Sequence, residues 1–236
     1  MQVLLTRPLE ESRALAEILE SDGIDAPIWP LTRIVPAVMA LELPFTTGGL
    51  LFTSANGVRV LAALTDRRDL PALCVGKATA DAARKAGFRG CFSANGDALA
   101  LADLARRSGI NDFFHPRGHD AAGDLKGWLA ETGQRVTEAV LYHAQETDPP
   151  PAQVDALLKR GKIDLVTIWS SRGAAILARH LANAGAVMRA TDLLAISPAA
   201  AEPLEASGFC RVLIAETPDG AAMLTKIRAY SSAEHK

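Results

Sequence analysis

An internal repetition constrains the fold of this sequence more than any other feature. Four segments return further along the chain in the same order and with similar lengths. The chain repeats LLFTSANGVRVL as VTIWSSRGAAIL, so Gly173 is the counterpart of Gly57, and it repeats LLTRPLEESR as FFHPRGHDAAG, so Arg117 is the counterpart of Arg7. All βα units resemble one another to some extent, but that does not explain the shared order. Two copies are too few for a solenoid, so we predict a duplicated α/β domain.

Short β-branched or leucine-rich runs alternate with helical patterns along the whole chain. The first three runs are VLLT, LLFT and ALCVG, and the helical patterns that follow them cover Pro8–Asp22, Asn56–Leu64 and Thr79–Ala86. Later runs are DFFH, VTEAVLY, LVTIW, LLAI and RVLIA. This alternation is typical of parallel sheets covered by helices. The sequence therefore predicts an α/β fold with roughly ten strands and nine helices.

Length and charge limit the classes of protein to consider. The 236 residues correspond to one large or two small domains, at about 150 residues per domain. With 49% hydrophobic and 22% charged residues, the composition is that of a globular protein. The net charge of −2 is spread evenly and offers no basic surface to nucleic acid.

The cysteines and the N-terminus point to the cytoplasm. Three widely spaced cysteines without a Cys-x-x-Cys motif predict neither a disulfide framework nor a metal site. The start MQVLLTRPLEE lacks the basic and apolar segments of a signal peptide and is too short to span a membrane. We expect a cytoplasmic protein that does not act at a membrane.

Two stretches are candidate linkers between domains. One is PLTRIVPAVMALELP, which has no helical periodicity, and the other contains the proline run Pro149–Pro151. We therefore expect hinges near Ile34–Leu43 and Tyr142–Pro151.

The turns after the strands are candidate ligand sites, because ligands of open α/β sheets bind beyond the carboxyl ends of the strands. Thr53, Ser54 and Asn56 can cap the helix that follows, and we expect Gly57 to let a ligand come close. The recurrence of such a turn at Ser170–Gly173 predicts paired walls of one cleft. Basic residues at these strand ends together favour an anionic ligand, although a solvated rim explains each one alone better; they are Arg7, Arg33, Lys77, Arg117 and Arg172.

Together, the motifs FTSANGV, VGKATA, AVLY and ETPDGAAML resemble those of the uroporphyrinogen-III synthase family over nearly the whole chain. The order and spacing of the motifs carry this resemblance rather than any single motif. It implies two flavodoxin-like parallel-sheet domains joined by a two-stranded linker. Residues 1–36 and 146–236 would form one domain, and residues 37–145 the other.

The resemblance also implies a reaction and its partners. Hydroxymethylbilane, a linear tetrapyrrole, would lose water and close to uroporphyrinogen III with inversion of ring D, without a cofactor or metal. Orientation and electrostatic preorganisation would supply most of the catalysis. The expected partner is this small-molecule substrate, which the preceding pathway enzyme could hand over to a monomeric synthase.

Site residues follow from the same resemblance. Tyr142 matches the cleft tyrosine of the family and is the catalytic candidate, with packing near the hinge as its alternative role. The segment Ser197–Ala201 departs from the Gly-x-x-Thr-Ala of many relatives, so any contact at Ala200 must use the backbone. The substrate-binding candidates are Arg7, Ser54, Ala55, Asn56, Gly76, Lys77, Thr79, Arg117, Ser170, Ser171, Arg172 and Ala200.

Two other functional classes compete with this interpretation. A non-enzymatic two-domain sensor for a small anion would share the hinge and cleft, whereas a nucleotide-dependent enzyme lacks support because both phosphate-loop fingerprints are missing. A metal pair at His115 and His119 is not expected, because Pro116 and Gly118 disrupt the helix that such spacing needs. Cys74, inside an apolar strand, is expected to be a buried residue rather than a nucleophile.

Overall fold

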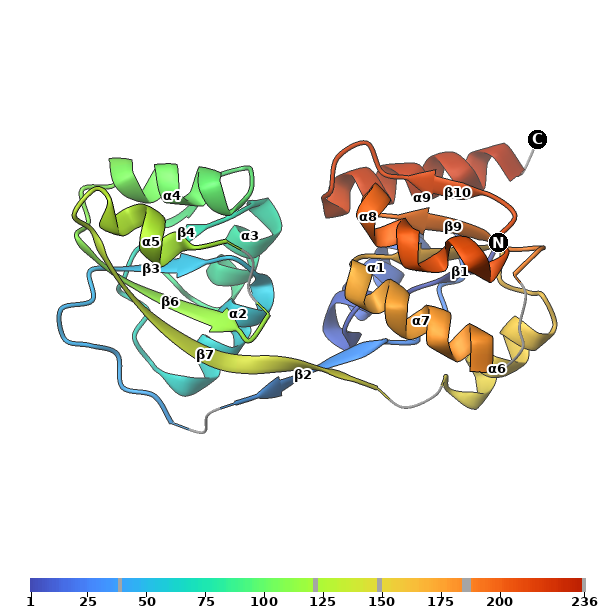
Figure 1. Cartoon of the computed structure of the whole chain (residues 1–236), viewed down its shortest axis with the longest axis horizontal. Coiled ribbons are helices and arrows are strands. Elements are labelled where there is room, and N and C mark those ends of the chain that lie inside the picture. Colours follow the sequence, from blue (N-terminus) through green and yellow to red (C-terminus); the bar gives the residue numbers. More distant parts are fainter. Residues whose placement is uncertain (38–39, 121–122, 148–149, 184–187, 235–236) are drawn as a thin grey trace. The chain divides into compact units, whose positions relative to one another are not determined.

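The computed structural model describes residues 1–37, 40–120, 123–147, 150–183 and 188–234. Its internal contacts divide the chain into two compact units. Unit 1 comprises Met1–Arg33 and Gln145–Lys236, and unit 2 comprises Ile34–Ala144 (Figure 1).

Unit 1 is built on a parallel sheet with the order β1-β8-β9-β10. Isolated parallel bridges from Gln2 to Asp25 and from Leu5 to Ile28 add the segment 25–28 beside β1. The strands are β1 (Val3–Leu4), β8 (Leu165–Ile168), β9 (Asp192–Ala195) and β10 (Val212–Ile214).

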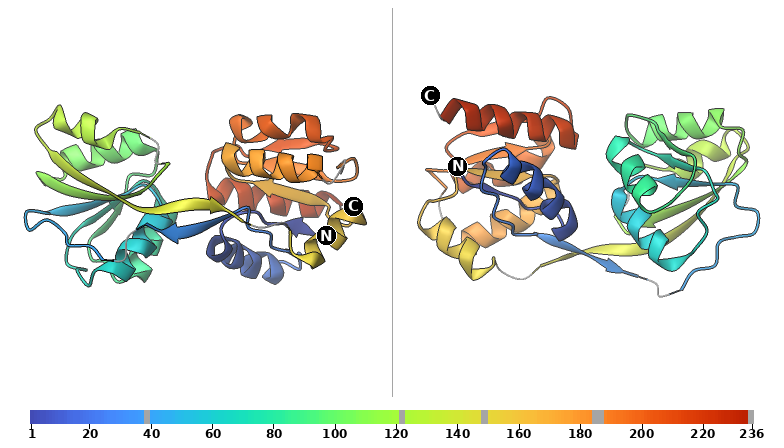
Figure 2. Two further views of the ribbon diagram at one scale, coloured as in Figure 1. Left: turned by 60° about the horizontal axis from the view of Figure 1, so that its bottom comes forward. Right: turned by 180° about the vertical axis from the view of Figure 1, so that it is seen from behind.

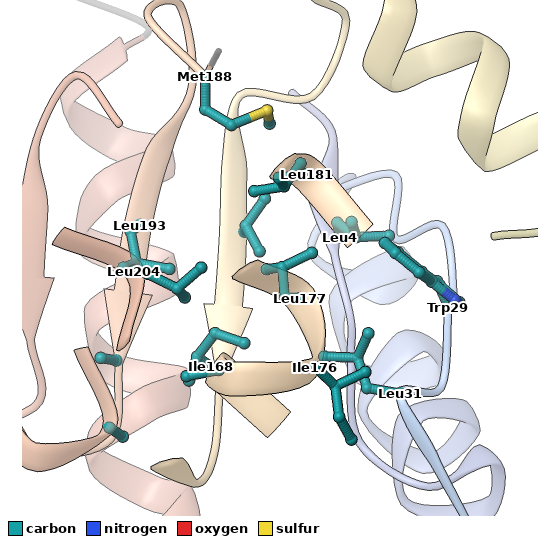
Figure 3. Close-up of a cluster of buried hydrophobic side chains, with 14 of the residues drawn as sticks. Leu4, Trp29, Leu31, Ile168, Ile176, Leu177, Leu181, Met188, Leu193 and Leu204 are labelled. Carbon is teal, nitrogen blue, oxygen red and sulfur yellow. The ribbon is translucent and has the colours of Figure 1, made fainter. Parts of the chain in front are cut away.

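Helices cover both faces of this sheet (Figure 2). Since successive strand residues point to opposite faces, the strands supply two separate cores. Leu4, Ile168 and Leu193 pack into a core with α7 and α8 (Figure 3), whereas Val3 and Leu5 pack into a core with α1 and α9. The helices are α1 (Leu9–Ser21), α6 (Ala152–Lys159), α7 (Ser171–Asn183), α8 (Pro198–Ala201), the 3₁₀ helix η1 (Glu202–Ser207) and α9 (Gly220–Glu234).

Unit 2 contains a sheet with the order β2-β7-β6-β3-β4-β5. The neighbouring pairs from β7 to β5 are all parallel. The unit boundaries fall within β2 and β7, which are neighbours in the sheet. The strands are β2 (Thr32–Pro36), β3 (Gly49–Phe52), β4 (Ala72–Cys74), β5 (Cys91–Ser93), β6 (Asp112–Gly118) and β7 (Arg135–Glu146).

Alternating strand residues again form two cores in unit 2. Phe52 packs with α2 and α3 on one face, and Leu51 packs with α4 and α5 on the other. These helices are α2 (Ala55–Leu64), α3 (Lys77–Lys85), α4 (Ala98–Arg107) and α5 (Leu125–Ala130).

A β-bulge interrupts the alternation in β7. Arg117 of β6 pairs with Val140, but the next residue, Gly118, pairs with Tyr142. The extra residue, Leu141, lets two consecutive side chains, Leu141 and Tyr142, pack into the same core. The bulge therefore decides where the Tyr142 side chain points.

The predicted α/β fold with parallel sheets is confirmed. The expected linker Ile34–Leu43 begins inside β2, and the expected linker Tyr142–Pro151 begins inside β7, which continues to Glu146. Residues 38–39 and 148–149, the latter including Pro149, lie outside the described residues.

Candidate functional site

A cavity of about 320 Å³ lies in unit 2 at the carboxyl ends of its strands. Strand β3 lies between β4 and β6. The chain continues from β3 to β4 on one side and returns later to β6 on the other, so the cavity lies at a topological switch point, the usual ligand site of such sheets. The lining residues are Thr53, Ser54, Val75, Ala98, Gly118, His119, Asp120, Tyr142 and Ala144.

Two hydroxyl groups meet at the wall of this cavity. The Ser54 Oγ and Tyr142 Oη atoms are 2.7 Å apart and share a hydrogen bond. Ser54 is also the N-cap of α2, and its Oγ accepts a hydrogen bond from the Gly57 N–H at 3.1 Å. The cap fixes the serine hydroxyl, and the serine in turn holds the tyrosine hydroxyl at the cavity.

The tyrosine ring packs on the backbone of Gly118. A Cβ atom at Gly118 would lie 2.8 Å from Cε2 of Tyr142, so this position accepts no side chain without moving the ring. Tyr142 is 9% exposed and belongs to the core with α2 and α3. It therefore combines the packing role with a hydroxyl that lines the cavity.

A buried histidine lies next to Thr53 in the cavity wall. The His115 Nε2 atom is 3.3 Å from Thr53 Oγ1, and its Nδ1 atom is 3.3 Å from Glu138 Oε1. Glu138 also forms an ion pair with Arg117, with 3.3 Å between Oε2 and Nε. Burial lowers the pKa of His115 below its usual value, even though Glu138 acts to raise it. The imidazole is therefore neutral at pH 7.

The other predicted site residues of unit 2 lie at the starts of α2 and α3. Asn56 accepts a hydrogen bond from Arg59 Nη2 at 2.7 Å, which occupies its carbonyl oxygen within the first turns of α2. Gly76 is the N-cap of α3, with Lys77 exposed and Thr79 buried just after it. Ala55 begins α2. Of the predicted residues within the described ranges, Ser54 and Tyr142 line the cavity.

The structure alters two expectations that were based on the sequence. The backbone carbonyl of Pro116 occupies the space beside Gly57, where a Cβ would lie 2.8 Å from that oxygen. Glycine is thus needed here for packing between α2 and β6, not for the approach of a ligand. Arg117, expected as an exposed cation, is paired with Glu138 and donates from Nη1 to the carbonyl of Gly118 at 3.2 Å.

Three of the predicted residues of unit 1 contact other residues of the same unit. The guanidinium of Arg7 lies 4.5 Å from the centre of the Trp169 ring. Ser170 accepts a hydrogen bond from the Gly173 N–H, and Ser171 donates one to the carbonyl of Ala199 at 2.8 Å.

Ala200 and Arg172 complete the set in unit 1. Ala200 is buried, and its backbone N–H donates to Ser197 Oγ at 3.3 Å as part of the cap of α8. Arg172 lies in the first turn of α7 and is exposed.

Among the residues that the structure describes, no three histidine, cysteine, aspartate or glutamate side chains are grouped so as to hold a metal ion. Within the same residues, no helix has both the length and the apolar character to cross a bilayer.

Comparison with known protein families shows to which family the chain belongs. A family model described as "Uroporphyrinogen-III synthase HemD" matches residues 13–225. The chain belongs to the uroporphyrinogen-III synthase family. The family predicted from the sequence is thereby confirmed, and membership gives no support to the sensor interpretation. The chain matches no curated protein in sequence.

Solved structures of uroporphyrinogen-III synthases are similar to this chain. The Helicobacter pylori enzyme has a TM-score of 0.61 at 17% identity, and the match covers 87% of this chain and 93% of that one. A mutant enzyme from Thermus thermophilus has a TM-score of 0.49 at 19% identity over 98% and 99% of the two chains. At these identities the likeness concerns the fold alone.

Sequence reasoning overlooked several residues of this candidate synthase site. Gly118, the last residue of β6, lines the cavity together with His119 and Asp120, which follow it. The sequence contained a signal for this part of the site, because these residues belong to the repeated segment FFHPRGHDAAG and lie at the end of a strand, as Ser54 does. Thr53 was recognised as a cap-type residue but not as part of the site.

The cysteines of this family member should differ sharply in reactivity. Cys74 lies buried in β4, and burial raises the pKa of its thiol to about 12, whereas Cys210 is exposed. Because the thiolate is the reactive form, we predict that iodoacetamide at pH 8 modifies Cys210 in the native protein and leaves Cys74 unmodified. Mass spectrometry of peptides checks this, with urea-unfolded protein as the control. Equal labelling of both cysteines before unfolding would contradict the burial of Cys74.

Proposed function

We propose that this chain catalyses the ring closure of hydroxymethylbilane to uroporphyrinogen III, with loss of water and inversion of ring D. The observation that carries the proposal is the family match over residues 13–225. In reaction class the protein would be a lyase that forms a cyclic product, and it would act in tetrapyrrole biosynthesis.

The chemistry requires few groups from the protein. The carbon–oxygen bond of the hydroxymethyl group breaks with help from the adjacent pyrrole nitrogen, and the oxygen leaves as water after taking up one proton. Ring closure later releases one proton, so the protein gains and loses none overall. We assign the proton donor to Tyr142, because its phenol lines the cavity and is held there by Ser54.

The proposed binding residues lie at the carboxyl ends of strands, where helix N-termini favour anionic groups such as the substrate carboxylates. Ser54 has the strongest support, because it lines the cavity and contacts Tyr142. The remaining proposed binding residues are Ala55, Asn56, Gly76, Lys77, Thr79 and Arg117 in unit 2, and Arg7, Ser170, Ser171, Arg172 and Ala200 in unit 1.

Strand order supports a duplicated flavodoxin-like domain. The strand order of unit 1 is (25–28)-β1-β8-β9-β10. The strand order of unit 2 is β7-β6-β3-β4-β5, with β2 added at the edge beside β7. The sequence counterparts of β1, β8, β9 and β10 are β6, β3, β4 and β5, and they hold the same positions in the order. We propose domains of residues 1–36 with 146–236 and of residues 37–145, with β2 and β7 as the two-stranded linker.

The test is incubation of the full chain with hydroxymethylbilane without added metal or nucleotide, followed by oxidation and separation of the porphyrin isomers. We expect predominantly the type III isomer. Spontaneous closure gives type I, so type I alone from well-folded protein would refute the proposed function.

A further inference from the structure

Four side chains form a continuous polar chain that ends at the cavity. Arg117 pairs with Glu138, Glu138 contacts His115 Nδ1, and His115 Nε2 contacts Thr53 Oγ1. His115 is 1% exposed, whereas Thr53 lines the cavity. Apart from Thr53, none of these groups appears in the lining of the cavity. Within this chain of contacts, Glu138 and His115 reach the cavity through Thr53.

The chemistry of the groups fixes the direction of each hydrogen bond. An ionised carboxylate only accepts hydrogen bonds, so the proton of a neutral His115 must lie on Nδ1 and point at Glu138. The Nε2 atom then carries a lone pair and can only accept. It follows that Thr53 donates its hydroxyl proton to His115. The lone pairs of Thr53 Oγ1 are left to face the cavity.

We propose that Glu138 and His115 are positioning residues that make Thr53 a hydrogen-bond acceptor for a pyrrole N–H of the substrate. This inference rests on the proposed function. It deepens that function by naming the group that the Thr53 side of the cavity recognises.

The chemistry of the substrate limits which of its groups can donate a hydrogen bond to Thr53. Its ionised carboxylates are acceptors and cannot pair with an acceptor oxygen, whereas a pyrrole N–H can only donate. The cavity wall also includes Val75, Ala98 and Gly118, which suit the face of a ring. At about 320 Å³, the cavity is at the lower end of the roughly 300–1,000 Å³ typical of ligand pockets, so it takes one part of a linear tetrapyrrole.

The first test measures the histidine tautomer directly in the full chain. The ¹⁵N signals of His115 among the five histidines are identified by their loss in His115→Leu or, if that variant does not fold, in His115→Asn. We expect a protonated Nδ1 and an unprotonated Nε2 at pH 7, and loss of this fixed tautomer in Glu138→Leu. A protonated Nε2 in the wild type, or an unchanged tautomer in Glu138→Leu, would overturn the proposal.

The second test separates positioning from simple packing by a double-mutant cycle on type III formation. Thr53→Val removes the hydroxyl and keeps the shape, so it should lower kcat/KM about two- to thirteen-fold, the effect of one neutral hydrogen bond. His115→Leu should cost a similar factor, and the double variant no more than either single one, because His115 acts through Thr53. Thr53→Ser, which keeps the hydroxyl, should restore most of the activity.

The outcomes of the double-mutant cycle test the positioning role and the proposed function separately. Multiplicative losses in the double variant, or a Thr53→Val variant within about two-fold of the wild type, would refute the positioning role while leaving the proposed function intact. If the wild type formed no type III isomer, the proposed function would fall and this inference with it. If His115→Leu did not fold, two measurements would still test the positioning role. They are the activities of Thr53→Val and Thr53→Ser compared with each other, and the histidine tautomer of the wild type and Glu138→Leu.

Discussion

Replacing Tyr142 by phenylalanine is expected to slow type III formation by about a hundred-fold or more, the usual contribution of a general acid. Phenylalanine keeps the ring that packs on Gly118 and removes only the hydroxyl, which lies 2.7 Å from Ser54 Oγ at the cavity. The hydroxyl group of the substrate needs a proton to leave as water, and Tyr142 is the proton donor that we propose. Single-turnover rates of the wild type and Tyr142→Phe give the measurement.

The control for this prediction is Tyr142→Ala. Because Tyr142 is nearly buried in the core with α2 and α3, this variant should also lose thermal stability, whereas Tyr142→Phe should melt close to the wild type. A rate loss of only two- to thirteen-fold in Tyr142→Phe would reduce the phenol to one neutral hydrogen bond. A rate within about two-fold of the wild type would remove Tyr142 from catalysis.

Replacing Gly57 by alanine should destabilise the protein by about 1–3 kcal/mol, the usual cost of forcing an extra carbon into a packed site. The new Cβ would lie 2.8 Å from the backbone oxygen of Pro116, which cannot rotate away as a side chain could. The substitution would otherwise favour the helix by about 1 kcal/mol, so any net loss comes from this contact.

Its counterpart Gly173 provides a matched control. A Cβ there would lie 3.3 Å from the Ser170 hydroxyl, which is a side-chain atom. Gly173→Ala should therefore stay within about 1 kcal/mol of the wild type. Urea unfolding of the two variants gives both values. Equal losses at the two positions would show that the carbonyl of Pro116 is not what requires glycine at Gly57.

Much of the fold could be predicted because each element carries its own signal. The run LLFT and the cap at Ser54 predict a strand followed by a helix, and both are found as β3 and α2. The end of β7 was harder to predict, because the proline run Pro149–Pro151 indicates a linker from Tyr142 onward, whereas the strand continues to Glu146. No local signal predicted the bulge at Leu141, which depends on the partner strand β6.

The sequence predicts individual residues of the candidate site but not how these residues are arranged in space. Ser54 and Tyr142 were each proposed from their motifs, yet their hydrogen bond joins residues far apart in the sequence. The sequence makes a metal pair of His115 with His119 unexpected and predicts no other role for His115, since its contacts depend on Glu138 of the neighbouring strand. Gly57 was assigned to ligand approach, because the sequence does not show which carbonyl lies beside it.

The central claim is that this chain directs ring closure to the type III isomer. Spontaneous closure competes with the enzyme for the same hydroxymethylbilane, so the isomer ratio measured at increasing protein concentration tests the claim most directly. We expect the type III fraction to rise from near zero towards one as protein is added, with no metal or nucleotide present. A product that stays type I at every concentration of folded protein would contradict it.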